Sequence, residues 1–400
     1  GAAVALGPVL GGLLLQNPQW SEWATGNAWG SVFLINVPIV AIGLVGIARV
    51  VPETKNPQPG RLDLRGLVVS VIGLVSLIFG IIHASETKDW TTASVLVPIA
   101  FGIMVLVAFV WLEAHSDHRS FDVSLFRNRG YAVSLTAVSL AFFALSGITF
   151  SLPFYLQVLR GYDTLQAGLC FLPFAVGQLI AAPRSAAMVM RFGYRTVITL
   201  GLLIVAVSLS GLTALGLTTP LWLVLLTFFG FGFGMGNVIA PASTLMQNAL
   251  PLARAGAGSA VQNTVRQVFG ALGVAVIGTL LATTYASNIS GSLGPLPEPA
   301  QTVATDSVVA TMNVLDAAEA AGAPTAQLET VREDAYDAFL GASRVTGAIS
   351  TSVVLLAAFA VGFFLPTIAP LKRAPSPAKA LAESTPATTG TTEAADVRTR

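Results

Sequence analysis

Long apolar runs alternate with short polar segments along most of the chain. A helix needs about 20 apolar residues to cross a bilayer. By this measure the sequence predicts ten spans, at 1–15, 30–50, 66–84, 93–112, 131–157, 165–190, 196–217, 221–249, 258–284 and 343–366. A long polar stretch, 285–341, separates the last two spans, and a Pro/Ala/Thr-rich tail, 367–400, is expected to be disordered. The pattern predicts an all-α polytopic membrane protein.

Composition and charge support this prediction. The chain is 54% hydrophobic and 10% charged, whereas soluble domains carry about 25% charged residues. If residue 1 is cytoplasmic, the cytoplasmic segments contain most of the basic residues: Arg49, Lys55, Arg61, Arg65, Arg119, Arg127, Arg129, Arg191, Arg195, Arg254, Lys372, Arg373, Lys379, Arg398 and Arg400. The opposite side contains only Lys88, Arg160, Arg332 and Arg344. Because cytoplasmic loops are enriched in Lys and Arg, we expect a multi-pass protein of the plasma or inner membrane with both chain ends in the cytoplasm.

The polar stretch 285–341 is acidic and is expected on the outer side. Its acidic residues are Glu298, Asp306, Asp316, Glu319, Glu329, Glu333, Asp334 and Asp337, against one arginine, Arg332. After Pro324, apolar residues recur at helical spacing at Leu328, Val331, Ala335 and Phe339. The pattern favours a solvated acidic loop with one amphipathic helix. The alternative is a helix that lies along the outer membrane surface.

No sequence feature indicates an enzyme, a cofactor or a metal site. The chain has no GxxxxGK[ST] phosphate-binding loop. His83, His115 and His118 lack the HExxH spacing or a cysteine partner that would favour zinc, and the lone Cys170 lies in an apolar run. The glycines of 230–236 do not have GxGxxG spacing and fall on two opposite faces of a helix, which predicts a helix packed closely on both sides. The net charge of +1 gives no reason to expect a nucleic-acid partner.

Polar residues at membrane depth are costly and tend to be functional. In the ninth predicted span Asn263, Arg266, Gly270 and Gly273 share one helical face with Ser259, and Gln262 and Gln267 flank it. Arg266 lies about 12 Å from the cytoplasmic end of its helix, because each residue adds about 1.5 Å. Two interpretations stay open for it: a place on a ligand or proton pathway, or a structural pair with another helix. The predicted spans contain no Asp or Glu at membrane depth.

Two further polar residues and the first span are candidates for function. Gln157 and Asn237 either line a cavity or make hydrogen bonds between helices. The first span contains Gly7, Pro8, Gly11 and Gly12, a composition that favours direct packing of another helix against its backbone.

Several of these segments resemble a known family. GPVLGG in the first span is similar to motif C of the drug:proton antiporters of the major facilitator superfamily, where that motif lies on the fifth helix. Other segments resemble the EmrB/QacA-type branch with fourteen helices, in matching order from residue 1 to about 366: WGSVFLINVP, RLDLRGLVVSVIGL, FDVSLFRNRGY, LPFYLQVLRGYDTLQAGLCFLP and QNTVRQVFGALGVAVIGTLL. The resemblance implies a major-facilitator-type helix bundle whose ten spans correspond to helices five to fourteen. The missing initial Met agrees with a C-terminal part of a longer protein.

The resemblance also implies a division of the chain and a set of site residues. Residues 1–50 would be the remainder of an N-terminal bundle, 51–130 two inserted linker helices and a cytoplasmic loop, 131–366 a C-terminal six-helix bundle that includes 285–341, and 367–400 a cytoplasmic tail. Motif A would map to Ala186, Met190, Arg191, Gly193 and Arg195, where its glycine and its acid are missing and a basic turn, Arg191, Gly193 and Arg195, is left. The acid tied to proton coupling, and any acidic partner of Arg266, would lie upstream.

Two hypotheses for function follow from the resemblance and the residues. The first is a secondary active transporter, expected to be monomeric, that exports drugs or other small amphiphilic or cationic molecules in exchange for protons. Two bundles would rock about a midplane site, with motif C sealing the contact between bundles and Arg266 in the cavity wall. A variant of this hypothesis is export of one metabolite, such as an amino acid, antibiotic or siderophore. The second hypothesis is a membrane scaffold that transports nothing. A chain that lacks the upstream helices is not expected to transport alone.

Overall fold

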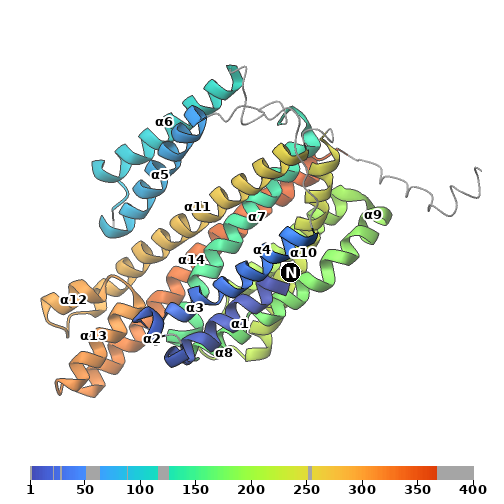
Figure 1. The fold of residues 1–400 in the computed structure, drawn as a ribbon. Coiled ribbons are helices and arrows are strands. Elements are labelled where there is room, and N and C mark those ends of the chain that lie inside the picture. Colours follow the sequence, from blue (N-terminus) through green and yellow to red (C-terminus); the bar gives the residue numbers. More distant parts are fainter. Residues whose placement is uncertain are drawn as a thin grey trace, which may run out of the picture. The chain divides into compact units, whose positions relative to one another are not determined.

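The computed structural model describes residues 2–20, 22–27, 29–50, 64–87, 89–115, 126–250 and 255–366, which form helices and contain no strand (Figure 1). The predicted tail, 367–400, lies outside these ranges, as does 51–63 of the predicted linker segment. The longer helices are α1 (Ala2–Gln16), α4 (Asn36–Val50), α5 (Leu64–Thr87), α6 (Ala93–His115), α7 (Arg129–Phe154), α9 (Leu172–Thr213), α10 (Leu221–Asn248), α11 (Ala255–Ile289), α13 (Val308–Ala320) and α14 (Thr325–Phe364). The shorter ones are α2 (Glu22–Thr25), α3 (Gly30–Leu34), α8 (Thr164–Leu169) and α12 (Glu298–Ala304).

Eight helices among the described residues are long and apolar enough to cross a membrane, so the prediction of an all-α polytopic membrane protein is confirmed. The prediction of ten spans differs from this number at two places. The first predicted span forms α1, whose 15 residues are fewer than a full crossing requires. The predicted spans 165–190 and 196–217 lie in one stretch, Thr164–Thr213, which Gly193 interrupts with φ 81° and ψ 160°. This break divides the stretch into two successive apolar segments.

Helix α10 packs against both halves of α9. A Cβ atom added at Gly232 would collide with the backbone of Phe174 in the first half of α9. On the opposite face of α10, a Cβ atom at Gly234 would lie 2.8 Å from the carbonyl oxygen of Gly201 in the second half. The sequence-based prediction of a glycine helix packed closely on two sides is therefore confirmed.

The remaining bundle helices also meet at small residues. Helix α7 packs on α11, where a Cβ atom at Gly273 would collide with the backbone of Phe143. Helix α14 packs on α7, α9 and α11, with Gly347 against the Thr213 side chain. Helices α5 and α6 form a hairpin that contacts α11, and the Thr279 hydroxyl donates a hydrogen bond to the carbonyl oxygen of Ile81 at 3.0 Å.

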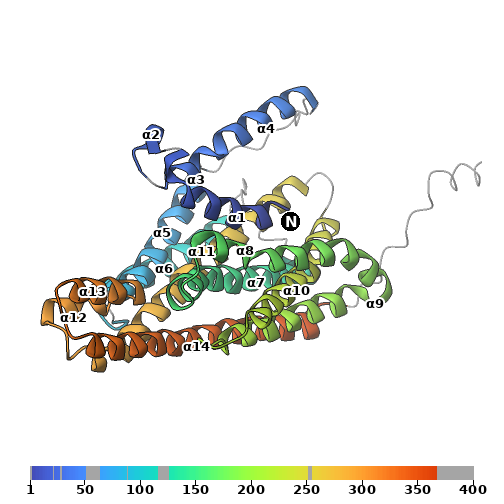
Figure 2. The same cartoon turned by 90° about the horizontal axis from the view of Figure 1, so that it is seen from below.

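One end of the bundle carries α12, α13 and the first turns of α14, and we call these residues, 298–340, the cap (Figure 2). The predicted amphipathic helix is present, and its four apolar residues, Leu328, Val331, Ala335 and Phe339, are all buried. It continues without a break into the last span as the 40-residue α14. Helix α13 packs on α14. The alternative of a helix along the outer membrane surface stays a prediction. Arg332 approaches Glu329, Asp316 and Glu319 within the cap, at 2.8, 3.6 and 3.8 Å.

Candidate ligand cavity

Helices α1 and α8 touch through their backbones. A Cβ atom added at the buried Gly12 would lie 2.5 Å from the carbonyl oxygen of Thr164 and 2.8 Å from the Cα atom of Leu165. In the reverse direction, a Cβ atom at Gly168 would collide with the carbonyl oxygen of Pro8. Glycine at both positions allows this close approach, as in membrane helices that pack through small residues.

The other two glycines of α1 that were predicted to pack closely do not make such a contact. A Cβ atom at Gly7 or Gly11 meets no atom within 4 Å among the described residues. The structure therefore places Gly12 alone of the three in close contact. Pro8, between Gly7 and Gly11, faces the cavity described below.

A tight turn fixes the start of α8. Gly161 adopts a left-handed backbone with φ 65°, which favours glycine. Asp163 then caps the helix, because its carboxylate accepts a hydrogen bond from the Gln166 N–H at 2.7 Å, while the Gln166 side-chain oxygen accepts one from the Asp163 N–H at 3.2 Å. This reciprocal capping box satisfies two N–H groups of the first turn and sets the first residue of α8, Thr164, against α1.

Arg160 fastens this turn to the loop between α9 and α10. Its Nη1 donates to the carbonyl oxygens of Leu217 at 2.9 Å and Thr219 at 2.7 Å. Its guanidinium lies over the rings of Tyr155 and Tyr162, with 6.0 and 5.7 Å to the ring centroids. The hydrogen bond to the Tyr162 hydroxyl raises the pKa of Arg160 above its ordinary value. Arg160 is one of the four basic residues predicted on the side that is poor in Lys and Arg. The structure shows that it braces this turn against the loop between α9 and α10.

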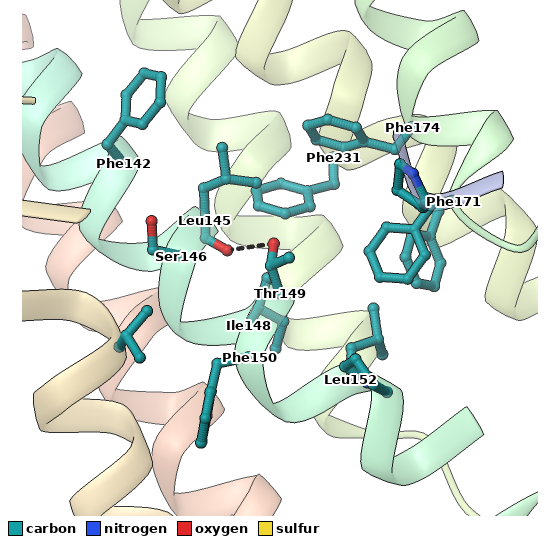
Figure 3. Close-up of a pocket in the computed structure, with 14 residues that line it drawn as sticks. Phe142, Leu145, Ser146, Ile148, Thr149, Phe150, Leu152, Phe171, Phe174 and Phe231 are labelled. Atoms are coloured by element: carbon teal, nitrogen blue, oxygen red, sulfur yellow. Dashed lines mark hydrogen bonds between the residues drawn. The ribbon is translucent and has the colours of Figure 1, made fainter. Parts of the chain in front are cut away.

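A cavity of about 610 Å³ lies beside the contact of α1 with α8. This volume is within the range of small-molecule sites, about 300–1,000 Å³. Most of its wall comes from α7, and the rest from α1, the start of α9, α10 and α11 (Figure 3). The lining residues are Pro8, Phe142, Leu145, Ser146, Ile148, Thr149, Phe150, Leu152, Pro153, Phe171, Phe174, Phe228, Phe231 and Val274.

The chemistry of this cavity is aromatic and nearly free of polar groups. Phe171 and Phe174 each pack against a phenylalanine of α10, Phe228 and Phe231 respectively, with 5.3 Å between ring centroids in both pairs. The Thr149 hydroxyl donates to the carbonyl oxygen of its own helix at Leu145, at 2.7 Å (Figure 3). We call this space the aromatic cavity. One ring pair is edge-to-face and the other is tilted, and such a wall of phenylalanine rings suits an apolar ligand with an aromatic body.

Arg266 places a positive charge next to the aromatic cavity. Its guanidinium carbon lies 4.9 Å from the ring centroid of Phe142, which lines the cavity. Its Nη2 donates to the side-chain oxygen of Asn263 at 2.8 Å. A guanidinium carries five N–H donors, so this hydrogen bond leaves donors for other partners. Among the described residues no carboxylate forms an ion pair with Arg266.

The other predicted site residues do not line the aromatic cavity. Gln262 is buried and donates to the Ser243 hydroxyl of α10 at 2.7 Å, a hydrogen bond between helices. Asn237 is 2% exposed and donates to the carbonyl oxygen of Phe233, and its own side-chain oxygen has no hydrogen-bond partner among the described residues. Gln157, Gln267 and Asn263 are exposed.

The basic turn predicted to be a remnant of motif A lies at the break within α9. Gly193 has φ 81° and ψ 160°, a backbone region open to glycine and closed to most other residues. Arg191 and Arg195 are exposed on either side, and the Arg191 guanidinium lies 5.2 Å from the Phe192 ring centroid. The positive φ at this position therefore explains why the turn contains glycine. The two arginine side chains on either side of the turn are exposed.

The sequence contains a signal for the aromatic cavity that polarity alone does not reveal. Phe142, Leu145 and Thr149 follow one another at helical spacing on α7, and Phe171–Phe174 and Phe228–Phe231 repeat the interval of three. Such spacing also occurs on lipid-facing helices, which are equally apolar. Only the packing of α7, α9 and α10 shows that these faces point toward one another.

The chain matches the Major Facilitator Superfamily over residues 1–274. It is similar to the multidrug efflux pump LfrA of Mycolicibacterium smegmatis, with 30% identity over 361 residues, covering 90% of this chain and 68% of that protein. It resembles the multidrug resistance protein Stp of Mycobacterium tuberculosis at 30% identity, covering 74% and 53%. It also resembles the tetracenomycin C resistance and export protein of Streptomyces glaucescens at 26% identity, covering 94% and 68%.

The chain therefore belongs to the major facilitator superfamily, and the resemblance to its drug-efflux branch drawn from the sequence is confirmed. It is a multi-pass membrane protein. The matched region spans about half the length of Stp. The fourteen-helix arrangement, the numbering of these spans as helices five to fourteen and the division into bundles stay predictions.

Proposed function

We propose that this protein exports small amphiphilic molecules with an aromatic body, in exchange for protons, as part of a two-bundle transporter. The aromatic cavity carries the proposal, because it combines a drug-sized volume with a wall of phenylalanine rings beside a glycine-mediated helix contact. The names of LfrA and Stp, a multidrug efflux pump and a multidrug resistance protein, support export of drugs.

The charge beside the cavity favours one class of ligand. Arg266 adjoins the Phe142 wall, and none of the residues that line the aromatic cavity is acidic. A fixed positive charge in a poorly solvated site attracts anions and repels cations. We therefore expect neutral or acidic aromatic compounds to bind here better than cations of similar shape.

Alternating access would use the contact between α1 and α8 as its seal. In this mechanism the Gly12 and Gly168 backbones hold the cavity closed at the end that carries the cap, which we expect to be the outer side. Release would require α1 to separate from α8, after which the turn at Gly161 could move with the start of α8. Proton movement would drive the return, through acidic groups expected upstream of this chain.

Everted membrane vesicles test the proposal. The vesicles come from cells that express the complete gene encoding this chain, and the probe is Nile red, an uncharged aromatic dye. We expect dye accumulation when respiration acidifies the vesicle interior, and loss of accumulation when a protonophore collapses the gradient. Accumulation that survives the protonophore would exclude proton coupling, and no accumulation with a neutral, an acidic or a cationic aromatic dye would exclude export of this class.

A matched pair of substitutions links transport to the cavity. Phe142→Ala removes a cavity ring next to Arg266 and is expected to reduce dye transport at equal protein level. Phe359→Ala removes a ring from α14 that is 56% exposed and lines no cavity described above, and is expected to leave transport unchanged. Equal transport by both variants would show that transport does not depend on the aromatic cavity.

A second candidate is a dedicated exporter of one metabolite. It is favoured by the similarity to the tetracenomycin C resistance and export protein, which extends over 94% of this chain. Competition distinguishes the two candidates in the same vesicles. If unrelated aromatic compounds all inhibit Nile red uptake, the multidrug candidate stands, whereas inhibition by a single compound class supports the dedicated exporter.

A further inference from the structure

A second cavity, of about 630 Å³, lies between the hairpin of α5 and α6 and the rest of the bundle. Its walls come from α5, α7, α11, the start of α13 and α14. We call it the hairpin cavity. Phe150 and Val274 line both this cavity and the aromatic cavity, so these two residues form the partition between them.

The membrane-spanning part of this cavity has a dry wall. Most of its lining residues are apolar, among them Ile78 of α5. The hydroxyl groups that α11 contributes already have partners: Thr279 donates to the carbonyl oxygen of Ile81 at 3.0 Å, and the hydroxyl of Tyr285 is hydrogen-bonded to that of Thr311. An occupant is therefore held by apolar contact and must itself be apolar over most of its length.

The hairpin cavity is elongated along α11. Its floor on this helix runs from Ala271 to Tyr285, through residues spaced by three or four. These two residues are 14 positions apart, which at about 1.5 Å per residue gives a length of about 21 Å. A bilayer with its headgroups is about 40–45 Å thick, so one leaflet measures about 20–22 Å. The cavity therefore has the length of one leaflet.

The depth of the cavity matches the outer leaflet. The apolar span of α11 begins at Gly258, and Ala271 lies 13 positions further along the helix. At about 1.5 Å per residue this places Ala271 about 20 Å from the cytoplasmic end of the span, close to the bilayer midplane. The opposite end of the floor, at Tyr285, adjoins Ser307 and the cap, which we expect on the outer side.

The cavity opens sideways, toward the bilayer. Helix α5 packs on α6 and α11, and among the described residues no packing of comparable extent joins α5 to α7 or α14. Ile82 of α5, Phe150 of α7 and Val274 of α11 line the cavity and are nevertheless exposed. Because α5, α7 and α11 are all long and apolar enough to span a membrane, the medium that reaches these side chains is lipid.

We propose that the hairpin cavity binds one acyl chain of an outer-leaflet phospholipid. The headgroup lies at the cap, and the chain follows α11 to the bilayer midplane. A flexible alkyl chain fits a floor of small residues, Ala275, Gly278 and Ala282, whereas the phenylalanine pairs of the aromatic cavity suit a ring. The bound chain fills the wedge between α5 and α7 and holds the hairpin against the bundle. The site does not require transport, so it stands or falls independently of the proposed export.

Photolabelling in liposomes tests this proposal on the protein expressed from the complete gene that encodes this chain. Two phosphatidylethanolamine probes carry a diazirine, one at the end of an acyl chain and the other close to the glycerol, and mass spectrometry locates the labelled residues. We expect the first probe to label Ala271 and the buried Ala275, and the second to label the floor near Tyr285. The opposite order, or no label on the buried floor, would overturn the proposal.

A matched pair of substitutions links the label to the cavity. Ala282→Phe places a ring on the floor and is expected to reduce labelling of α11 about tenfold, the effect of removing about two methylene groups from an apolar site. Ala100→Phe adds the same ring at an exposed position of α6 that lines neither cavity, and is expected to leave this labelling unchanged.

A second pair covers the case in which Ala282→Phe disturbs the fold. Ile82→Asn makes an exposed part of the cavity wall polar and is expected to reduce labelling of α11, whereas Leu96→Asn makes the same change on the exposed surface of α6 and is expected to have no effect. Equal labelling of wild type, Ala282→Phe and Ile82→Asn would contradict the proposal. Loss of the label in the presence of saturating Nile red or a free fatty acid would assign the cavity to those ligands and would also contradict it.

Discussion

Gly12→Ala is expected to weaken the contact between α1 and α8. The new Cβ atom would lie 2.5 Å from the Thr164 carbonyl oxygen and 2.8 Å from the Leu165 Cα atom. Both are backbone atoms, so no side-chain rotation relieves the overlap. To reach an ordinary contact distance of 3.4 Å to the oxygen, the helices must move apart by about 0.9 Å.

The size of the effect follows from this displacement. A gap of about 0.5–1 Å removes a quarter to a half of the dispersion energy of each contact, and overpacking a close contact costs about 1–3 kcal/mol. The same substitution raises helix propensity by up to about 1 kcal/mol. Gly11→Ala carries the same propensity gain without the overlap, because its Cβ atom meets nothing within 4 Å among the described residues. The free energy of unfolding is therefore expected to differ between the two variants by about 1–3 kcal/mol.

Thermal unfolding of the purified chain measures this difference. Intrinsic tryptophan fluorescence reports the transition, since Trp20 and Trp29 follow α1 in sequence. We expect Gly12→Ala to unfold at a lower temperature than Gly11→Ala in the same detergent. A Gly12→Ala variant as stable as Gly11→Ala would refute the backbone contact.

Three further predictions concern structural residues and use the same unfolding assay. Arg160→Met removes two hydrogen bonds to loop carbonyls and should lower the free energy of unfolding by about 1–3 kcal/mol. Arg160→Lys should lower it less, because it keeps the charge. Equal stability of both variants and wild type would contradict the bracing role of Arg160. Gly193→Ala forces an L-residue to φ 81°, and should cost about 1–3 kcal/mol, so an unchanged transition would argue against the break in α9. Asn237→Leu removes a buried acceptor without a partner among the described residues, and should not lower the unfolding temperature; a marked decrease would assign that oxygen a partner.

The sequence predicted the helical elements well, because crossing a bilayer imposes a length and a composition that a single chain displays directly. It also predicted that α10 packs on two faces, since glycines four residues apart identify a helix face without any knowledge of the partner. It did not predict that α14 runs through the cap without a break, because amphipathic spacing at Leu328 and Val331 does not reveal where a helix begins or ends relative to a membrane.

The candidate site was less accessible to sequence reasoning. Arg266 was identified because a charge at membrane depth is rare, and the structure places it beside a cavity wall. The phenylalanines of that wall were missed, because an apolar residue that faces a cavity and one that faces lipid look alike in sequence. Gly168 was missed for a related reason, since its role depends on Pro8, which lies far from it in the chain.

The most direct test of the account is whether the α1–α8 contact closes the aromatic cavity. Cys170 is the only cysteine, so Cys170→Ala provides a background in which Ser146→Cys places a single thiol in the cavity wall. A membrane-impermeant maleimide is then added from the side that carries the cap. If the α1–α8 contact closes the cavity, this thiol is labelled slowly, and markedly faster when Gly12→Leu is also present. Equal labelling rates with and without Gly12→Leu would contradict it.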